Sequence, residues 1–357
     1  MTAKRRQSRR TPAAKPRKTR RGRIRGLLLL CALAALGVLG WAGWLYAGPG
    51  PDAKAGVTTV VLEKGSGVAR IADQLAAARV IRSKAFFMLA AKLGGGTLKA
   101  GEYAVPARAS MARILSDLRA GRVVRHMITI PEGWTSEMAA EAVARSPVLT
   151  GAAIPPPEGT LLPETYEVRR GEPRAEVLAR MREAQVKLLA RLWPSRQAGL
   201  PFTTPEQALA LASIVEKETA IAAERPRVAA VYVNRLRAGM RLESDPTTIY
   251  GISRGRPLGR GITRSELAAA TPYNTYQIAG LPPTPIANPG RASIEAVLNP
   301  PKTDELFFVA DGDGGHAFAA SFSEHQKNVA RWREIERRRM AEQQGAAAAS
   351  GAEGRDG

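Results

Sequence analysis

Residues 211–219 read LASIVEKET, and this stretch decides the fold of the second half of the chain. At about 100° per residue of helix, Leu211 and Ile214 fall on one apolar face, and Glu218 falls in the middle of that face. Ser213 falls towards the polar side. A carboxyl group directed into an apolar surface loses hydration, which raises its pKa and suits it to act as a general acid. The alternative is that the helix ends near Glu218, so that the carboxyl reaches water or pairs with an arginine.

A helix-start signal precedes this stretch. Thr204 suits the N-cap position, Pro205 suits the first helical position, and Gln207 completes a capping box. We therefore expect a helix over residues 205–219. The segment LFFVA at 306–310 is the clearest strand of this half. Further helices are expected over residues 227–237, 265–270, 293–299 and 324–339.

The preceding part of the chain predicts a small module of mixed helix and strand. The β-branched run TTVVLEK at 58–64 is typical of a strand, and a second strand is expected over 98–105. Two helices are expected between them, over 68–78 and from an N-cap at Ser83. This β-α-α-β order is extended by a helix near 110–120 and a strand over 123–130. Residues 131–200 read as a connector with helices over 136–145 and 175–192 and an ordered loop over 152–166.

The N-terminus carries much of the charge of the chain. Lys and Arg number 53 against 32 Asp and Glu, a net charge of +21, and twelve of those cations stand in residues 1–26, which hold no acid. Residues 27–47 have no charge and end in an aromatic group, and a Gly-Pro-Gly-Pro break follows. This length matches a hydrocarbon layer, and basic residues before it favour the cytoplasmic side. The aromatic residues are Trp41, Trp44 and Tyr46.

Two interpretations of this N-terminus compete. We favour an uncleaved membrane anchor over a cleaved signal peptide, because the apolar run is long for a signal peptide and the cleavage site is poor. The rest of the chain would then be exported, where ATP is scarce, so hydrolytic, lytic or binding roles become more favourable. A basic arm can also bind nucleic acid. Beside a membrane helix, attraction to anionic lipid is the simpler explanation, so we expect no nucleic-acid partner.

Composition excludes several classes of protein. Cys31 is the single cysteine and the histidines number three, so a disulfide within the chain and a four-cysteine zinc site are excluded. HExxH and the phosphate-binding GxxxxGK[ST] pattern are both missing. A metal site built from histidine and carboxylates stays formally open, but we expect neither a metal nor a cofactor.

Three loops of the second half carry residues that suit a sugar. Residues 243–251 form a polar turn that enters a short helix, 271–276 (TPYNTY) combine two tyrosines with amide and hydroxyl groups, and 280–290 are rich in proline. Sugar rings stack on aromatic faces, and their hydroxyls take hydrogen bonds. Asp245, in the first loop, suits either a contact with a glycan or a helix N-cap.

Six separated motifs now carry a resemblance. Through these motifs, which stand in the same order as in the family, roughly residues 57–335 resemble the endolytic murein transglycosylase (YceG-like) family. That family cleaves the MurNAc–GlcNAc β-1,4 bond within peptidoglycan strands and leaves a 1,6-anhydro end, and its catalytic glutamate matches Glu218. The segment KAGEY at 99–103 resembles the LysM-like region of the family. The motifs are SIVEKET (213–219), VNRLRAGMRL (233–242), SDPT (244–247), YNTY (273–276), GLPP (280–283) and GGH (314–316).

The resemblance implies a fold class and a set of parts. We expect an α+β protein with one transmembrane helix, a LysM-like module and a mainly helical catalytic domain. It implies a single-pass protein of the bacterial inner membrane with a cytoplasmic N-terminus, peptidoglycan strands as substrate, and peptidoglycan synthases as partners. The expected parts are a basic arm (1–26), a transmembrane helix (27–47), the LysM-like module (52–130), a connector (131–200), the catalytic domain (201–340) and a disordered tail (341–357).

The chemistry of the family needs one carboxyl group. A hydrolase uses two carboxylates at a set spacing, whereas a lytic transglycosylase uses the C6 hydroxyl of the sugar in place of water. Glu218 would protonate the leaving oxygen and then take the proton of the C6 hydroxyl. The expected glycan-binding residues are Asp245, Thr247, Tyr273, Asn274, Thr275 and Tyr276.

Three other ionisable residues receive structural interpretations. We expect Glu216 to be a solvated surface charge. His316 follows DGDGG, which resembles a calcium loop only loosely, and a turn with a hydrogen-bonded histidine is favoured. His325 is expected to be structural as well.

Other functions stay open from the sequence. The first alternative is a membrane-anchored, non-catalytic glycan-binding scaffold of the wall-synthesis machinery. A two-carboxylate hydrolase would leave reducing ends instead of anhydro ends. A metal-dependent amidase is disfavoured by the scarcity of His and Cys.

Overall fold

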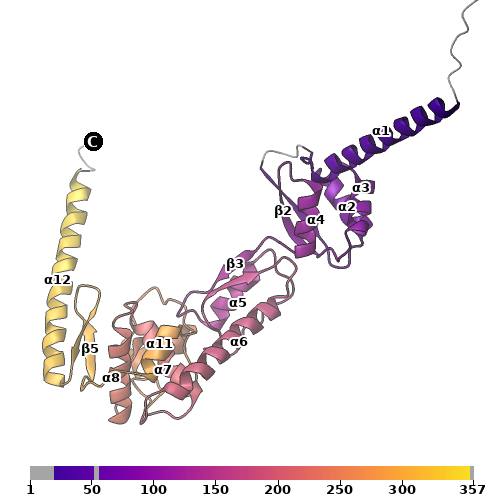
Figure 1. Cartoon of the computed structure of the whole chain (residues 1–357). Coiled ribbons are helices and arrows are strands. Elements are labelled where there is room, and N and C mark those ends of the chain that lie inside the picture. The colour runs from indigo at the N-terminus through magenta and orange to yellow at the C-terminus, as the bar shows by residue number, and fades with distance from the viewer. Residues whose placement is uncertain (1–19, 52–55, 354–357) are drawn as a thin grey trace, which may run out of the picture. The chain divides into compact units, whose positions relative to one another are not determined.

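The structure is a computed structural model that describes residues 20–51 and 56–353 (Figure 1). Most of the basic arm, residues 1–19, lies outside the described residues. The chain divides between Val124 and Arg125 into two compact units, and each is described by itself.

The first unit begins with a long apolar helix. Helix α1 spans Arg20–Ala47 and ends directly before the Gly-Pro-Gly-Pro break, as expected. Within it, Ile24–Ala47 is long and apolar enough to cross a membrane, with a mean hydropathy of 2.1. Length and composition alone support this span.

The β-α-α-β order of the first unit is confirmed. Strands β1 (Val57–Leu62) and β2 (Gly101–Pro106) pair antiparallel. Helices α2 (Val68–Ala77) and α3 (Lys84–Leu93) lie between them in sequence, and α4 (Met111–Ala120) follows. The Ser83 hydroxyl caps α3 by accepting a hydrogen bond from the Phe86 amide. Apolar residues of all five elements form one buried core.

The strand expected over 123–130 belongs to the second unit and does not extend the first. Strand β3 (His126–Thr129) pairs antiparallel with β4 (Thr165–Val168). Strand β4 begins within the stretch that we expected to be a loop. The expectation was wrong because the pattern of a strand is local, whereas its partner stands about forty residues further along the chain.

The expected connector is a folded layer of the second unit. Helices α5 (Ser136–Arg145) and α6 (Arg174–Leu192) lie close to their expected bounds, and the short 3-10 helix η1 (Trp193–Ser195) follows α6. These helices pack with strands β3 and β4 around a core that includes Val143 and Met181.

In the rest of the second unit, helix α7 (Pro205–Glu218) packs on α8, α9 and α11 (Figure 1). The Thr204 hydroxyl accepts from the Gln207 amide and the Gln207 side chain accepts from the Thr204 amide, so the capping box is confirmed. The elements after α7 are α8 (Arg225–Arg237), α9 (Asp245–Ser253), α10 (Arg264–Ala268), α11 (Arg291–Leu298), β5 (Phe307–Ala310), β6 (His316–Ala319) and α12 (Phe322–Glu353).

Helix α7 is buried on every side over residues 208–215, so it is a central helix and not an amphipathic one. Ser213, expected towards the polar side, is completely buried. Its hydroxyl donates to the Ala210 carbonyl at 2.7 Å and accepts from the Ile286 amide at 2.9 Å. The helical wheel was wrong here because the segment 280–290 covers the face that it assigned to solvent.

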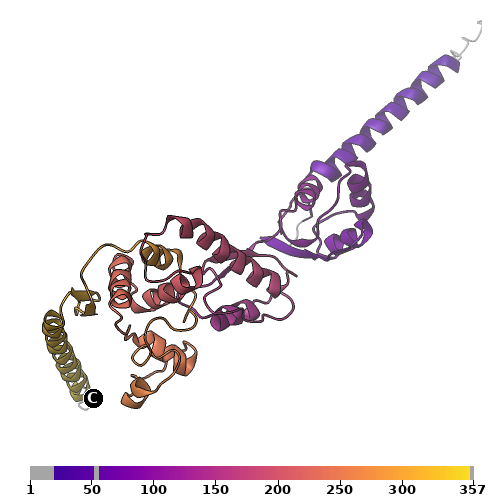
Figure 2. The same ribbon diagram turned by 90° about the horizontal axis from the view of Figure 1, so that it is seen from below.

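The C-terminal helix is longer than expected. Helix α12 packs along the β5–β6 hairpin and continues to Glu353, so the structure gives helix over residues 341–353, where a disordered tail was expected (Figures 1 and 2). Residues 354–357 lie outside the described residues. Alanine is the strongest helix former, which explains why an Ala-rich sequence extends the helix.

Glu216 is also not the solvated charge that we expected. Its side chain is 4% exposed and forms an ion pair with Arg225 at 3.0 Å, while its second oxygen accepts from the Gly290 amide at 2.9 Å. Arg225 pairs with Glu132 as well. The pair joins α7 to the start of α8. A helical wheel of α7 cannot predict it, because Arg225 belongs to another helix.

Replacement of Glu216 by alanine is expected to destabilise the second unit by about 3 kcal/mol, because it leaves a nearly buried arginine with one partner fewer. Urea unfolding of the purified protein measures this free energy. Glu183→Ala is the matched control, because Glu183 forms an exposed pair with Lys187, and it should leave the transition unchanged. An equal effect of both substitutions would contradict the assignment.

Candidate active site

The carboxyl group of Glu218 lies where three elements meet. Glu218 is the last residue of α7. Its Oε1 accepts a hydrogen bond from the Tyr232 hydroxyl on α8 at 2.6 Å and another from the Ser244 hydroxyl, just before α9, at 2.5 Å. The helix thus ends at Glu218, as the alternative interpretation held, but the hydrogen-bond donors among the described residues are two hydroxyls and not an arginine.

The environment of Glu218 favours its protonated form. Burial raises its pKa, and the negative charge of Asp245 raises it further. The hydrogen bonds from Ser244 and Tyr232 and the charge of His316 act in the opposite direction, but the net pKa remains raised. A raised pKa is what suits a carboxyl group to act as a proton donor.

Tyr232 is a fixed donor to this carboxyl. Its side chain is buried, and burial together with the neighbouring Glu218 carboxylate raises its pKa well above the ordinary value. The hydroxyl therefore keeps its proton. Its ring meets Phe308 edge-on, with centroids 5.8 Å apart. Packing thus holds the hydroxyl in place before any substrate arrives.

Ser244 is fixed by two buried threonines. Its amide donates to the Thr275 hydroxyl at 2.9 Å, and the Thr247 hydroxyl donates to the Ser244 carbonyl at 2.7 Å. Thr247 and Thr275 also contact each other at 2.8 Å. Upstream, the nearly buried Arg235 donates to the Leu242 carbonyl at 2.9 Å. The turn that carries Ser244 therefore has little freedom.

The buried residues of the predicted glycan-binding set form hydrogen bonds within the protein interior. Asn274 donates to three carbonyls of the segment 266–269, and its oxygen accepts from the Thr248 hydroxyl. Thr247 and Thr275 are likewise completely buried. A contact of these three side chains with a sugar stays a prediction, and their placement favours a role in holding the loops.

The other predicted residues reach the surface. Asp245 is exposed and accepts from the Tyr276 hydroxyl at 2.7 Å. The N-cap of α9 is Ser244, so Asp245 stands one position inside the helix and not at its cap. Tyr273 is partly exposed, and its ring meets Tyr250 edge-on with centroids 4.9 Å apart. Of the six predicted glycan-binding residues, Asp245, Tyr273 and Tyr276 are the three whose side chains are not buried, and their contact with a glycan stays a prediction.

His316 is the hydrogen-bonded histidine that the sequence favoured. It is the first residue of β6, and its Nδ1 lies 2.7 Å from a carboxylate oxygen of Glu224. His325 packs against Phe307, with centroids 5.1 Å apart. Among the described residues, His, Cys, Asp and Glu form no group of three that could hold a metal.

The sequence did not identify the two residues whose hydroxyls donate hydrogen bonds to Glu218. Tyr232 stands fourteen residues after Glu218 and looked like an ordinary core residue. Ser244 stood inside a quoted motif, but a serine before a helix is typical of a cap. A tyrosine hydroxyl on the apolar face of the helix predicted over 227–237 is the sequence feature that could have identified Tyr232.

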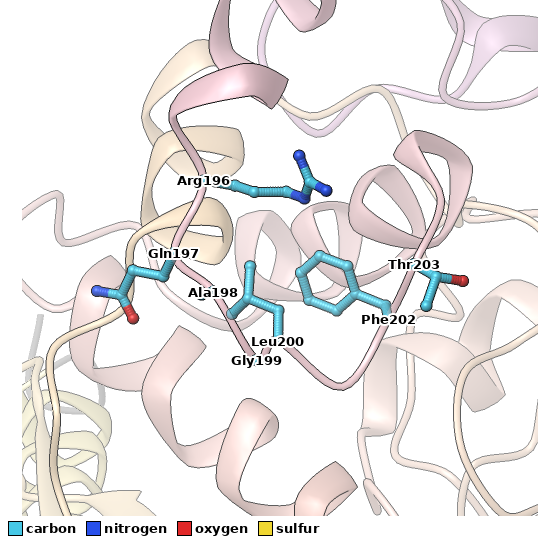
Figure 3. Close-up of a pocket in the computed structure, with 7 residues that line it drawn as sticks. All are labelled: Arg196, Gln197, Ala198, Gly199, Leu200, Phe202 and Thr203. Carbon is cyan, nitrogen blue, oxygen red and sulfur yellow. The ribbon is translucent and has the colours of Figure 1, made fainter.

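A surface pocket lies away from these residues. Residues 196–200, 202 and 203 line it, between η1 and α7, and none of the predicted site residues is among them (Figure 3). The guanidinium of Arg196 stacks over the Trp193 ring at 4.1 Å. Glu218, Tyr232 and Ser244 are not among the residues that line this pocket.

Comparisons with known proteins agree on one family. The YceG-like family matches residues 60–331. The chain is 34% identical over 172 residues to an endolytic murein transglycosylase of Bacillus subtilis, covering 48% of this chain and 47% of that protein. It is 30% identical over 323 residues to an endolytic murein transglycosylase of Streptococcus pneumoniae, covering 76% of this chain and 58% of that one. The chain thus spans about half the length of these relatives.

A solved structure is also similar. It is that of a putative yceG-like protein from Listeria monocytogenes, with 27% identity and a TM-score of 0.47. The alignment covers 77% of this chain and 99% of that one.

The raised pKa of Glu218 predicts an effect on stability. Because the folded pKa lies above the unfolded one, the contribution of this carboxyl is most favourable at low pH and is lost as pH rises through the folded pKa. Glu218→Gln should therefore stabilise the protein above neutrality and have little effect in acid. Melting temperatures measured across pH check this.

Glu342→Gln is the matched control, because Glu342 is exposed on α12. It should leave the melting temperature unchanged across the pH range. A Glu218→Gln protein that is less stable than the wild type at every pH would contradict the burial of a protonated carboxyl.

Proposed function

The chain belongs to the YceG-like family, and we propose that it is an endolytic lytic transglycosylase of peptidoglycan. The observation that carries the proposal is the carboxyl group of Glu218, whose pKa burial raises and which two fixed hydroxyls hold in place. The names of the relatives support the same activity. The proposed substrate bond is the β-1,4 bond between MurNAc and GlcNAc within a glycan strand.

The reaction proceeds in two proton transfers. Glu218 first donates its proton to the glycosidic oxygen, and the bond between that oxygen and C1 of MurNAc breaks. The C6 hydroxyl of the same MurNAc then attacks C1, and its proton returns to Glu218. The products are a GlcNAc with a free 4-hydroxyl and a 1,6-anhydroMurNAc end, so water is not consumed. The attack is intramolecular, which lowers its entropic cost.

The hydrogen bonds at Oε1 suit both steps. They leave the second oxygen of Glu218 to carry the proton towards the sugar. When that proton has left, the hydroxyls of Tyr232 and Ser244 stabilise the carboxylate. The same carboxyl can then accept the C6 proton. This chemistry requires neither a metal nor a cofactor.

The glycan is proposed to lie across the exposed side chains beside Glu218. Asp245 and Tyr276 bond to each other and offer polar atoms to sugar hydroxyls, while Tyr273 offers a ring edge and a hydroxyl. Thr247, Asn274 and Thr275 support them from below. Asp245 is a carboxylate that raises the pKa of Glu218, so it is the residue that a hydrolase would use as its second carboxyl.

The proposed setting is the bacterial inner membrane. Residues 24–47 would anchor the chain once, with the basic arm in the cytoplasm and the rest outside it. The β-α-α-β module is proposed to be LysM-like and to hold glycan. An enzyme so anchored would terminate nascent strands beside peptidoglycan synthases, its proposed partners. The alternative is a non-catalytic, glycan-binding scaffold of the same machinery.

Incubation of the full-length protein in detergent with purified peptidoglycan tests the activity. Mass spectrometry is expected to show internal fragments that end in 1,6-anhydroMurNAc. Glu218→Gln should lower their rate of formation by roughly 10²- to 10⁴-fold, because it removes the general acid. Glu342→Gln, an exposed substitution of the same kind, should leave the rate unchanged.

Two outcomes would replace the proposal. Fragments with reducing ends would mean a hydrolase, and Asp245→Asn would then abolish cleavage as well. Retained binding to glycan without cleavage would establish the scaffold alternative.

The orientation of the anchor is tested by cysteine labelling. In a Cys31→Ala background, which has no other cysteine, Ala341→Cys should react with a membrane-impermeant maleimide in spheroplasts. Ala3→Cys should react only after lysis. The opposite pattern would contradict the orientation, and loss of residue 3 from the mature chain would establish a cleaved signal peptide.

A further inference from the structure

Three aromatic rings gather where α12 begins, and the mechanism above does not use them. Phe307 lies on β5, while Phe322 and His325 lie in the first turn of α12, which packs beside β5 (Figure 1). The Phe307 ring stacks on His325 with centroids 5.1 Å apart and meets the Phe322 ring at 5.8 Å. Phe322 and His325 meet at 6.3 Å. The three rings therefore form one cluster, the aromatic platform.

The aromatic platform is open to solvent. Phe322 is 59% exposed, and Phe307 and His325 are partly exposed. A ring that served only to hold α12 on the hairpin would gain most from burial, because stabilisation grows with the apolar area removed from water. Adjacent exposed rings with charged groups beside them are instead typical of a binding surface.

A charged pair borders the platform. The guanidinium of Arg235 lies over the Phe307 ring, 5.4 Å from its centroid, and pairs with Glu243 at 3.3 Å. The Arg235 side chain is 9% exposed, whereas that of Glu243 is 48% exposed. Glu243 also has a left-handed backbone, with φ of 52°, which is uncommon for a residue with a side chain. An accessible carboxylate therefore lies one ion pair away from the rings.

The turn that carries this carboxylate also leads to the site. Ser244 directly follows Glu243, and its hydroxyl donates to Glu218 at 2.5 Å. The Glu243 amide donates to the Thr275 carbonyl at 3.2 Å, in the loop that carries Tyr276. A continuous series of contacts therefore connects the platform with the carboxyl group that acts on the glycan and with a residue of the proposed glycan surface.

The chemistry of the platform suits a sugar. A pyranose ring has a face of C–H groups that stacks on an aromatic ring, and hydroxyls at its edge that donate to a carboxylate. Binding sites for small molecules and sugars combine aromatic side chains with a few polar groups in this way. An enzyme that cuts within a strand must also hold sugars beyond the cleaved bond, so contacts further from Glu218 are required.

We propose that the aromatic platform of Phe307, Phe322 and His325 is a binding site for a sugar of the same glycan strand, beyond the bond that Glu218 cleaves. This inference rests on the proposed function and deepens it. Phe322 supplies the exposed ring face, and Phe307 and His325 support it. The strand then passes from Glu218 over the turn at residues 241–244 to the start of α12.

The test is binding of glycan by the full-length protein in detergent, in a Glu218→Gln background so that no strand is cut. The probe is purified glycan strands freed of their stem peptides. Phe322→Leu keeps an apolar side chain but removes the ring, so it should weaken binding roughly 3- to 10-fold. Phe322→Trp keeps a ring and should bind as tightly as the parent. Unchanged affinity in Phe322→Leu would overturn the proposal.

Met340→Leu is the matched control. Met340 lies on the same helix and is 53% exposed. Its replacement should leave the affinity for the strands unchanged. Equal weakening by Met340→Leu, or equal weakening by Phe322→Leu and Phe322→Trp, would overturn the proposal, because a general disturbance of α12 predicts both results.

Photo-crosslinking gives a readout that does not depend on affinity. With p-benzoylphenylalanine in place of Phe322, irradiation beside the strands should give a protein–glycan adduct in the mass spectrum, and the same group in place of Met340 should give none. No adduct from position 322 would overturn the proposal. A wild type that binds strands but makes no anhydro ends would refute the proposed function, and the crosslink would still decide whether the platform binds a sugar.

Discussion

The structure depends on one carboxyl group held at the end of a buried helix. Helix α7 is buried over residues 208–215, and it places Glu218 at the point where α8 and the turn before α9 meet. Taking a carboxylate out of water is unfavourable, so burial raises the pKa of Glu218 and favours its protonated form. The hydroxyls that bond to it are themselves fixed by packing. The position of Glu218 at the end of α7 thus places both the proton to be donated and the two hydroxyls that stabilise the carboxylate after the proton has left.

Two glutamates two residues apart have opposite environments on this helix. Glu216 bonds to Arg225 and to the Gly290 amide, which are partners for an ionised carboxylate. Glu218 bonds to two hydroxyls that keep their own protons and carry no charge. The first glutamate fastens α7 to its neighbours, and the second performs the proposed chemistry. Helical geometry separates the two roles, because residues two apart face different sides.

Local features of the fold were predictable from the sequence, and long-range ones were not. The capping box at Thr204 and the ends of α5 and α7 follow from short motifs, and the position of Glu218 on an apolar face follows from helical spacing. The pairing of β3 with β4, the Glu216–Arg225 pair and the Tyr232 hydroxyl bond depend on residues brought together only by folding. A helical wheel also assigns one face to solvent, and it fails for a helix that is covered on all sides, as Ser213 demonstrates.

The central claim is that one carboxyl group cleaves the glycan without water. Cleavage of purified peptidoglycan in ¹⁸O-labelled water, with the new ends analysed by mass spectrometry, tests this claim most directly. Intramolecular attack by the C6 hydroxyl predicts new MurNAc ends that contain no ¹⁸O. Incorporation of one ¹⁸O atom at C1 of each new end would contradict the account, because it would show that water attacks the sugar.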